Sequence, residues 1–319
     1  MPENQNATGE HWTRESVAIF KQLGWSQHGS TNFDISCTRH PARKGQGHGI
    51  DSFFTYYDPY EQSEQGILVE SKCWEFDSIT TANMKKWIKQ VTECMECAQV
   101  SDTLQSLSTA PIKNAIIMCW ANDTFDLDKF RERVKAISVG SKKYNCNLYI
   151  ASNYEILRWC SLINTINELR RTCSEFKFVY PNVPTLGTNF VKADHVTLTH
   201  LYSKFIFAQA KSEVRNSRVS EIKDQLIVFC FEKASLQSLE FMYDMIKQLN
   251  LQDAQEYIFY LFERETPIRQ TVAEFKRKIE GQISGDLDAP SSVCIKYLDV
   301  YDGMTHIPDN IINFEEVSE

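Results

Sequence analysis

The stretch Ile67-Leu68-Val69-Glu70-Ser71-Lys72 is an apolar run that ends in a Glu-x-Lys tripeptide. Such a run predicts a β-strand, whose side chains point alternately to its two faces. Glu70 and Lys72 are therefore expected on one face and Ser71 on the other. Asp51, which belongs to a second predicted strand upstream, is placed to add another carboxylate. Two carboxylates beside a lysine can bind a hard cation and activate a water molecule, as phosphodiester hydrolysis requires.

The tripeptide alone is not diagnostic, because Glu-x-Lys also occurs at residues 175–177, 221–223 and 274–276. Only Glu70 follows an apolar strand and has an acidic residue upstream that emerges from a glycine-rich turn. Glu274 lies in a helical charge pattern, where residues i and i+2 do not share a face. Without such a context a Glu-x-Lys is expected to be a solvated surface pair, so a functional interpretation is favoured only for Glu70.

Length and composition indicate an ordinary globular protein. A chain of 319 residues suits two modest domains or one large domain, and its 42% apolar and 24% charged content is typical of soluble proteins. No apolar stretch approaches the roughly 20 residues that span a bilayer. The N-terminus carries no basic, apolar signal region. We therefore expect a cytoplasmic protein without a membrane segment.

The ten cysteines are scattered singly through apolar segments, apart from one Cys-x-x-Cys. This distribution predicts reduced core residues rather than a disulfide framework. The Cys-x-x-Cys pair, Cys94 and Cys97, lies inside a helical pattern and has no second pair in the sequence. Partial burial on a helix is therefore expected there, rather than a zinc site.

The net charge of −8 is unevenly distributed. Residues 1–177 carry 20 Lys and Arg against 21 Asp and Glu, whereas residues 178–319 carry 14 against 21. The first part also contains a segment without acidic residues, between Asp34 and Asp51. A basic loop beside a metal site could contact phosphates, although a solvated turn is an equally good interpretation of any single residue. The candidate phosphate-binding residues of this segment are Arg39, Arg43, Lys44 and His48.

Residues 11–24 have the periodicity of an amphipathic helix, which Gly24 ends. Glu15 lies on the apolar face of this helix, between Trp12 and Ile19. A carboxylate drawn toward a core needs a partner, and either a metal site or a basic residue would serve. The alternative is that the edge of the helix leaves Glu15 exposed.

The remaining pattern of the first half predicts strands alternating with helices. The expected strands are 33–39, 49–57, 66–74, 115–120 and 148–151, and the further helices begin near 81, 126 and 153. The order α-β-β-β-α-β-α-β-α implies a mixed central sheet flanked by helices. The predicted fold class is therefore α/β.

The second half predicts a smaller α+β domain. Residues 180–184 with Gly187 are the best linker candidate, so the expected domains are 1–177 and 178–319. Expected strands are 204–210, 225–232, 256–262 and 293–300, and expected helices are 235–249 and 268–280. This part contains no catalytic constellation, and its acidity disfavours direct contact with DNA. Contact with a partner protein is its predicted role.

A first-helix acid, Asp51 after Gly-x-Gly-Ile, and Val-Glu70-Ser-Lys72 within one α-β-β-β-α-β frame resemble the PD-(D/E)xK, or restriction-endonuclease-like, superfamily. The resemblance covers about residues 10–170. It implies that Asp51 and Glu70 are metal-binding acids, and that Lys72 orients the attacking water and stabilises developing charge. Glu15 is similar to the acid that many members carry on their first helix.

Two further positions complete the comparison with this superfamily. Gln90, on the helix after the Glu-x-Lys strand, is similar to a glutamine that some members use near the site. Ile50 stands where the namesake proline would be, a position where other members also carry an aliphatic residue. Trp74 and the long C-terminal region resemble nucleases of bacterial anti-phage defence systems.

The resemblance implies that Asp51, Glu70 and the carbonyl of Ser71 bind Mg²⁺ or Mn²⁺. The expected function is a metal-dependent DNA endonuclease in a defence complex, with a partner subunit bound through residues 178–319. Homo- and hetero-oligomers are both left open. The alternatives are a nuclease-fold scaffold or binding subunit without activity, and an RNase or branched-DNA resolvase.

Overall fold

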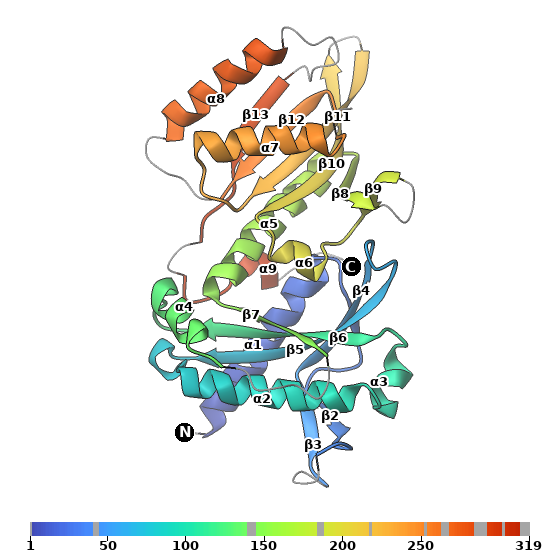
Figure 1. The fold of residues 1–319 in the computed structure, drawn as a ribbon, viewed down its shortest axis with the longest axis vertical. Coiled ribbons are helices and arrows are strands. Elements are labelled where there is room, and N and C mark those ends of the chain that lie inside the picture. Colours follow the sequence, from blue (N-terminus) through green and yellow to red (C-terminus); the bar gives the residue numbers. More distant parts are fainter. Residues whose placement is uncertain are drawn as a thin grey trace. The chain divides into compact units, whose positions relative to one another are not determined.

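A computed structural model describes residues 2–40, 45–138, 145–183, 188–216, 219–251, 254–262, 268–283, 292–301 and 304–312 (Figure 1). Its chain forms two compact units. Unit 1 comprises Met1–Cys160 together with Tyr301–Glu319, and unit 2 comprises Ser161–Val300. The first boundary thus lies upstream of residue 177, where the sequence places it, and the chain returns to unit 1 after unit 2.

Unit 1 is built on a mixed five-stranded sheet with the strand order β1-β4-β5-β6-β7. The strands are β1 (Ser26–His28), β4 (Ser52–Asp58), β5 (Ser63–Trp74), β6 (Ile112–Ala121) and β7 (Asn147–Ala151). The pairs β1–β4 and β4–β5 are antiparallel, whereas β5–β6 and β6–β7 are parallel. Parallel neighbours need crossover connections, which the intervening helices supply. The predicted mixed α/β sheet is confirmed.

Helices cover both faces of this sheet. They are α1 (Pro2–Gln22), α2 (Thr81–Ala98), the short α3 (Asp102–Leu107), α4 (Leu127–Lys135) and α5 (Asn153–Thr172), with a 3₁₀ turn at Phe76–Ser78. On one face the apolar side of α2 packs against Leu68 and Ile117. On the other, Trp12 of α1 stacks on Trp120, and its indole N–H donates to the Met118 carbonyl at 3.0 Å.

The strand expected at 49–57 is divided into two. Its first part belongs to β3 (Gly47–Ile50), which pairs with β2 (Phe33–Ser36) in a separate two-stranded sheet. Its second part is β4 of the main sheet, so the prediction of one continuous strand is wrong. Asp51 stands between the two strands, at the point where the chain changes sheets. Strand β1 and helix α3 were not predicted from the sequence.

The end of the chain completes unit 1. Helix α9 (Asp309–Ile312) packs against α1, and Gln22 Nε2 donates to the Ile311 carbonyl at 2.6 Å. The indole N–H of Trp120 donates to the Thr305 carbonyl at 3.2 Å. Ile307 and Ile311 are fully buried. Residues 304–312 therefore contribute core side chains to unit 1.

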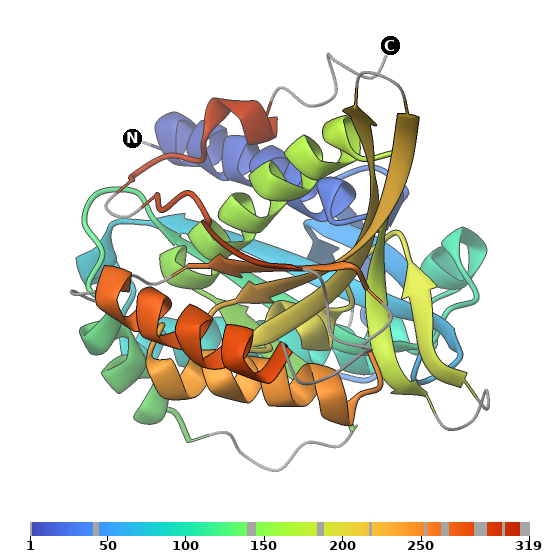
Figure 2. The same cartoon turned by 90° about the horizontal axis from the view of Figure 1, so that it is seen from above.

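Unit 2 is an α+β unit with a six-stranded sheet of order β13-β12-β11-β10-β8-β9. Its strands are β8 (Glu175–Val183), β9 (Thr188–Ala193), β10 (Phe205–Asn216), β11 (Val219–Cys230), β12 (Glu256–Leu261) and β13 (Ser292–Tyr297), and α6 (Leu198–Leu201) precedes β10. Helices α7 (Leu236–Gln248) and α8 (Ile268–Ile283) lie side by side on one face of the sheet (Figures 1 and 2). Phe275 of α8 meets Phe259 of β12 in this core.

The linker expected at residues 180–184 is wrong for residues 180–183, which belong to β8. Pro184 and Gly187 lie outside the described residues. Pro181 is tolerated in β8 because this end of the strand pairs only with β9, whereas the pairing with β10 ends at Val179. Proline lacks the N–H that a second neighbour would require.

The structure also bears on the expected absence of membrane segments and disulfides. Within the described ranges, no helix combines the length and the apolar character needed to cross a bilayer. The ten cysteines all lie in the described ranges, where none of them is in a disulfide, and six of them are buried.

Candidate active site

Strand register brings Asp51 next to the Glu-x-Lys motif. β4 pairs antiparallel with β5, with Ser52 opposite Val69, so the chain entering β4 runs beside Glu70. Asp51 Oδ2 accepts a hydrogen bond from the backbone N–H of Ser71 at 2.6 Å. This charge-assisted bond fixes the orientation of the carboxylate.

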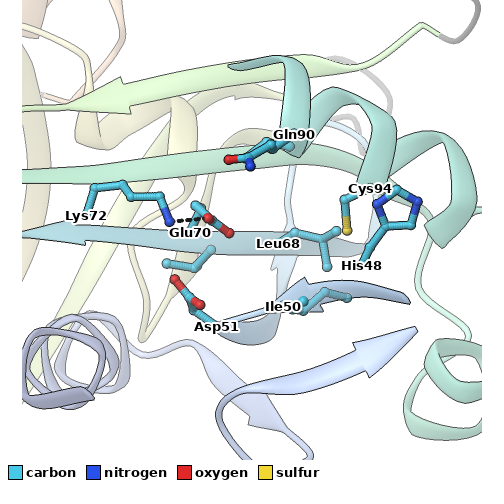
Figure 3. Close-up of a pocket in the computed structure, with 11 residues that line it drawn as sticks. His48, Ile50, Asp51, Leu68, Glu70, Lys72, Gln90 and Cys94 are labelled. Carbon is cyan, nitrogen blue, oxygen red and sulfur yellow. Dashed lines mark hydrogen bonds and ion pairs between the residues drawn. The ribbon is translucent and has the colours of Figure 1, made fainter. Parts of the chain in front are cut away.

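Glu70 and Lys72 project from the same face of β5, as the alternation of strand side chains predicts (Figure 3). The Lys72 ammonium donates to Glu70 Oε1 in an ion pair, and both side chains are largely shielded from solvent. The face that carries them is the one that α2 covers. Asp51, Glu70 and Lys72 therefore converge on one side of the sheet.

The three side chains line a cavity of about 250 Å³. Its wall is formed by the β3–β4 corner, β5 and α2, and its lining residues are His48, Gly49, Ile50, Asp51, Leu68, Val69, Glu70, Lys72, Gln90, Val91 and Cys94. Figure 3 shows Gln90 and Cys94 on α2, across the cavity from Leu68 and Ile50 on the strands. The structure thus places Gln90 and His48, two of the candidate site residues, at the same cavity as the acids.

Burial dominates the electrostatics of this cavity. It raises the pKa of Asp51, against the opposing effects of the Ser71 N–H and the Lys72 charge. Burial also raises the pKa of Glu70, and the neighbouring Asp51 charge adds to the rise. For Lys72, burial alone would lower the pKa, but Glu70 and Asp51 outweigh it and the pKa is raised. The ammonium is therefore held in its charged form.

The residues of this cavity fit a divalent cation. Two half-buried carboxylates lie beside one ammonium, so ionisation of both acids leaves an excess negative charge in a poorly solvated place. Burial is the main cause of the raised pKa values of Asp51 and Glu70, and the Asp51 charge adds to the rise for Glu70. A hard cation with oxygen ligands would offset the excess negative charge.

Glu15 is buried in α1, as its position on the apolar face predicts. Its Oε1 lies 3.2 Å from His11 Nε2, so a basic residue is the partner that the structure shows. Burial raises the pKa of Glu15, and the His11 and His306 charges oppose the rise. Glu15 does not line the cavity, and among the described residues it forms no three-acid cluster with Asp51 and Glu70.

The remaining candidates belong to the basic segment. Arg39 is exposed and does not line the cavity. Arg43 and Lys44 lie outside the described residues. The sequence singled out Cys94 only as half of a Cys-x-x-Cys pair, whereas the structure places it in the lining of the cavity, one helical turn after Gln90. That spacing of four residues was the available signal, because it puts the two side chains on one face of a helix.

A family model for the GAPS4 protein PD-(D/E)XK nuclease domain matches residues 1–155. The match includes Asp51, Glu70 and Lys72 and all five strands of the main sheet. A search of curated proteins gave no match. With the mixed sheet, the strand register and the convergent acids in place, residues 1–155 form a PD-(D/E)XK nuclease domain similar to that of the GAPS4 protein.

Proposed function

We propose that the protein is a metal-dependent endonuclease that hydrolyses phosphodiester bonds of DNA. The observation that carries this proposal is the convergence of Asp51, Glu70 and Lys72 on one cavity in a nuclease-family domain. The β4–β5 register and the alternation of β5 create this arrangement, and neither depends on a mobile surface side chain.

Asp51, Glu70 and the backbone carbonyl of Ser71 would hold the ion, either Mg²⁺ or Mn²⁺, because all three offer oxygen ligands. When bound, such an ion polarises the scissile phosphate and lowers the pKa of a coordinated water. The Ser71 N–H holds the Asp51 carboxylate in place for this role.

Lys72 supplies the fixed positive charge of the site. Glu70 accepts a hydrogen bond from its ammonium and thereby positions it at the cavity. In the reaction, the ammonium would orient the attacking water and stabilise the charge that develops on the phosphate oxygens. The burial of the pair strengthens this effect, since water screens it less.

DNA is the proposed substrate, with the basic segment that contains Arg39, Arg43 and Lys44 as the source of backbone contacts. We further propose that the protein acts in the cytoplasm, in an antiviral defence complex. Residues 178–319, with their excess of acidic residues, would bind a partner protein rather than the nucleic acid. RNA and branched DNA are the alternative substrates, since the same three residues can cut them.

The test is cleavage of duplex DNA, single-stranded DNA, branched DNA and RNA by the full-length protein, with Mg²⁺, Mn²⁺ or EDTA. A parallel set of assays includes the proteins that co-purify with it. Lys72→Ala and Glu70→Ala are expected to reduce metal-dependent cleavage by at least about 10²–10³-fold, the cost of removing one electrostatic stabiliser of a transition state.

The chain offers a matched control in another strand-borne Glu-x-Lys. Glu175 and Lys177 lie in β8, where Lys177 pairs with Asp194 at 2.6 Å. Lys177→Ala should therefore cleave like the parent. Unchanged cleavage by Lys72→Ala would disprove the proposed site. No cleavage of any substrate by the parent with its co-purifying proteins would favour the scaffold instead.

A further inference from the structure

A second cluster of ligating side chains lies outside the acidic triad. It consists of Cys37 and His40, which follow β2, His48 in β3, and Cys97 in the last turn of α2. One sulfur or nitrogen atom from each residue lies within 4.8 Å of every other. His48 and Cys97 are buried and the other two are half-buried. Two thiols and two imidazoles thus meet from three separate elements.

Two distances within the cluster match the edges of a metal tetrahedron. Cys37 Sγ and Cys97 Sγ each lie 3.5 Å from Nδ1 of His40. A tetrahedral zinc ion with Zn–S of about 2.3 Å and Zn–N of about 2.0–2.1 Å separates its sulfur and nitrogen ligands by about 3.6 Å. Cys37, His40 and Cys97 therefore need little rearrangement to surround one ion, and a nitrogen of His48 lies within 4.8 Å of their ligand atoms.

Glu96 provides an independent indication of the same role. Its buried carboxylate lies 2.9 Å from Nε2 of His40, on the side of the ring away from the two sulfurs. A histidine that binds a metal through one nitrogen commonly donates its other N–H to a carboxylate, which fixes the tautomer and the ring orientation. With its proton on Nε2, His40 directs the Nδ1 lone pair at the cluster. This also accounts for a carboxylate that is buried near the end of α2.

A hydrogen-bonded core cluster is the simpler alternative, but it explains less. Thiols are weak hydrogen-bond donors and weak acceptors, so two thiols gain little from facing the His40 and His48 imidazoles. Cys37 and Cys97 form no disulfide with each other. The convergence of four metal-ligand side chains would then have no energetic reason.

We propose that Cys37, His40, His48 and Cys97 bind a structural Zn²⁺ ion. Four protein ligands close the coordination shell and leave no position for a substrate, as in other structural zinc sites. The soft sulfur ligands separate this site from the oxygen-lined cavity at Asp51 and Glu70, which suits a harder ion. The proposal does not depend on the nuclease activity.

The zinc site would fasten the β2–β3 sheet to the end of α2. His48 is two residues upstream of Ile50 and three upstream of Asp51, so the ion would fix the chain that delivers Asp51 to its cavity. His40 and His48 also flank the basic residues Arg43 and Lys44 in the sequence. In this role His48 is a metal ligand rather than the phosphate contact expected from the sequence.

The test is the metal content of the full-length protein, measured by inductively coupled plasma mass spectrometry after dialysis against a weak chelator. The parent should retain about one zinc per chain, and Cys97→Ser and Cys37→Ser should lose it. Cys94→Ser is the matched control, since Cys94 lies on the same helix one turn earlier and is not in the cluster. The double variant Asp51→Ala, Glu70→Ala should retain zinc.

Two measurements on the parent protein avoid variants that fail to fold. A thiol-modifying reagent should release the zinc, detected with a chromogenic chelator. Replacement of zinc by Co²⁺ should produce the thiolate-to-cobalt charge-transfer and visible bands of a tetrahedral site. A reduced, metal-free parent that binds neither Zn²⁺ nor Co²⁺ would overturn the proposal, and so would zinc that disappears with Asp51 and Glu70.

Glu96 is proposed as a positioning residue, and its role has a separate readout. Glu96→Gln should weaken zinc binding by about 10–100-fold in a chelator competition, while the stoichiometry at saturating zinc stays at about one per chain. An affinity equal to that of the parent would show that the His40–Glu96 contact does not orient a ligand.

Discussion

At the scale of single residues, the burial of Asp51 couples the stability of the protein to pH. Its pKa is higher in the folded chain than in the unfolded chain, where a carboxyl group has a pKa near 4. The folded state therefore binds more protons between these two pKa values, and stability falls as the pH rises through this window. Above the window, the ionised Asp51 destabilises the metal-free fold.

Asp51→Asn is therefore expected to raise the melting temperature of the metal-free protein at neutral pH, while abolishing cleavage. Mg²⁺ should raise the melting temperature of the parent and leave that of the variant unchanged. Asp123 is the matched control, because the N–H of Phe76 lowers the pKa of this exposed carboxyl group. Asp123→Asn should not stabilise the protein. A lower melting temperature for metal-free Asp51→Asn would contradict this account.

The same protonation controls metal binding. Because the ion binds the ionised acids, protons compete with it, and the raised pKa values of Asp51 and Glu70 bring this competition toward neutral pH. Cleavage at limiting Mg²⁺ is expected to decline as the pH is lowered, and more Mg²⁺ should move that decline to lower pH. Initial rates over a grid of pH and Mg²⁺ concentration measure this shift. An acid limb that does not move with Mg²⁺ would argue against metal binding by these two carboxylates.

Residue-level prediction succeeded where a local period decides the outcome. The alternation of a strand places Glu70 and Lys72 on one face, and the helical period places Glu15 on the buried side of α1. The helical or strand periodicity of a segment does not specify which side chains from other segments it contacts in the fold. For this reason the sequence could not specify His11 as the described partner of Glu15, or bring Cys97 to Cys37. The spacing Cys37-x-x-His40 was the available signal for the second cluster.

At the scale of elements, Gly66 controls the packing of β5 on β6. A Cβ atom at this position would lie 2.9 Å from Ile112 Cγ1 and 3.2 Å from Phe53 Cε2. The register between β5 and β6 also shifts here, between Gly66 and Ile67. The absence of a side chain at this point is therefore a packing requirement of the sheet.

Gly66→Ala is expected to destabilise the protein by about 1–3 kcal/mol, because the new methyl group overpacks the core. Chemical denaturation followed by tryptophan fluorescence measures this change. Gly9→Ala in α1 is the matched control: a Cβ atom there meets nothing within 4 Å. That change should stabilise the helix by about 0.5–1 kcal/mol. Equal effects of the two substitutions would refute the packing argument.

Element prediction was most accurate for long periodic segments and least accurate at corners. Helix α2 and strand β6 lie where the apolar pattern predicts them, because each buries a continuous set of side chains. The corner at Asp51 was missed, since strands β3 and β4 follow each other directly and share one apolar pattern. Pro181 led to the opposite error: it suggested a linker where the structure has strand β8, because a strand end with one neighbour tolerates proline.

At the scale of the whole molecule, the six tryptophans all lie in unit 1, at positions 12, 25, 74, 87, 120 and 159. Tryptophan fluorescence therefore reports the unfolding of the nuclease unit without a contribution from unit 2. Trp120 itself contacts the C-terminal segment through the Thr305 carbonyl. This probe is suited to test whether residues 304–312 stabilise unit 1.

Ile311→Ala should lower the stability seen by tryptophan fluorescence by about 2–5 kcal/mol, because a fully buried side chain of α9 is truncated. Phe241→Ala is the control in unit 2, where the side chain is 53% exposed, and it should leave the fluorescence transition unchanged. Coincident transitions of parent and Ile311→Ala would mean that α9 is dispensable for unit 1. The sequence could not predict that the chain rejoins unit 1 after unit 2, because the apolar pattern of α9 does not specify that α9 packs against α1.

Because α9 packs against α1, translation supplies the last described helix of the nuclease unit only after residues 161–300 have been synthesised. A ribosome that stops within residues 161–300 releases a polypeptide with Asp51, Glu70 and Lys72 but without Ile307 and Ile311. Such a product lacks part of its core and is expected to be cleared by cellular proteases. The proposed hydrolytic centre would thus accumulate in a cell only together with unit 2.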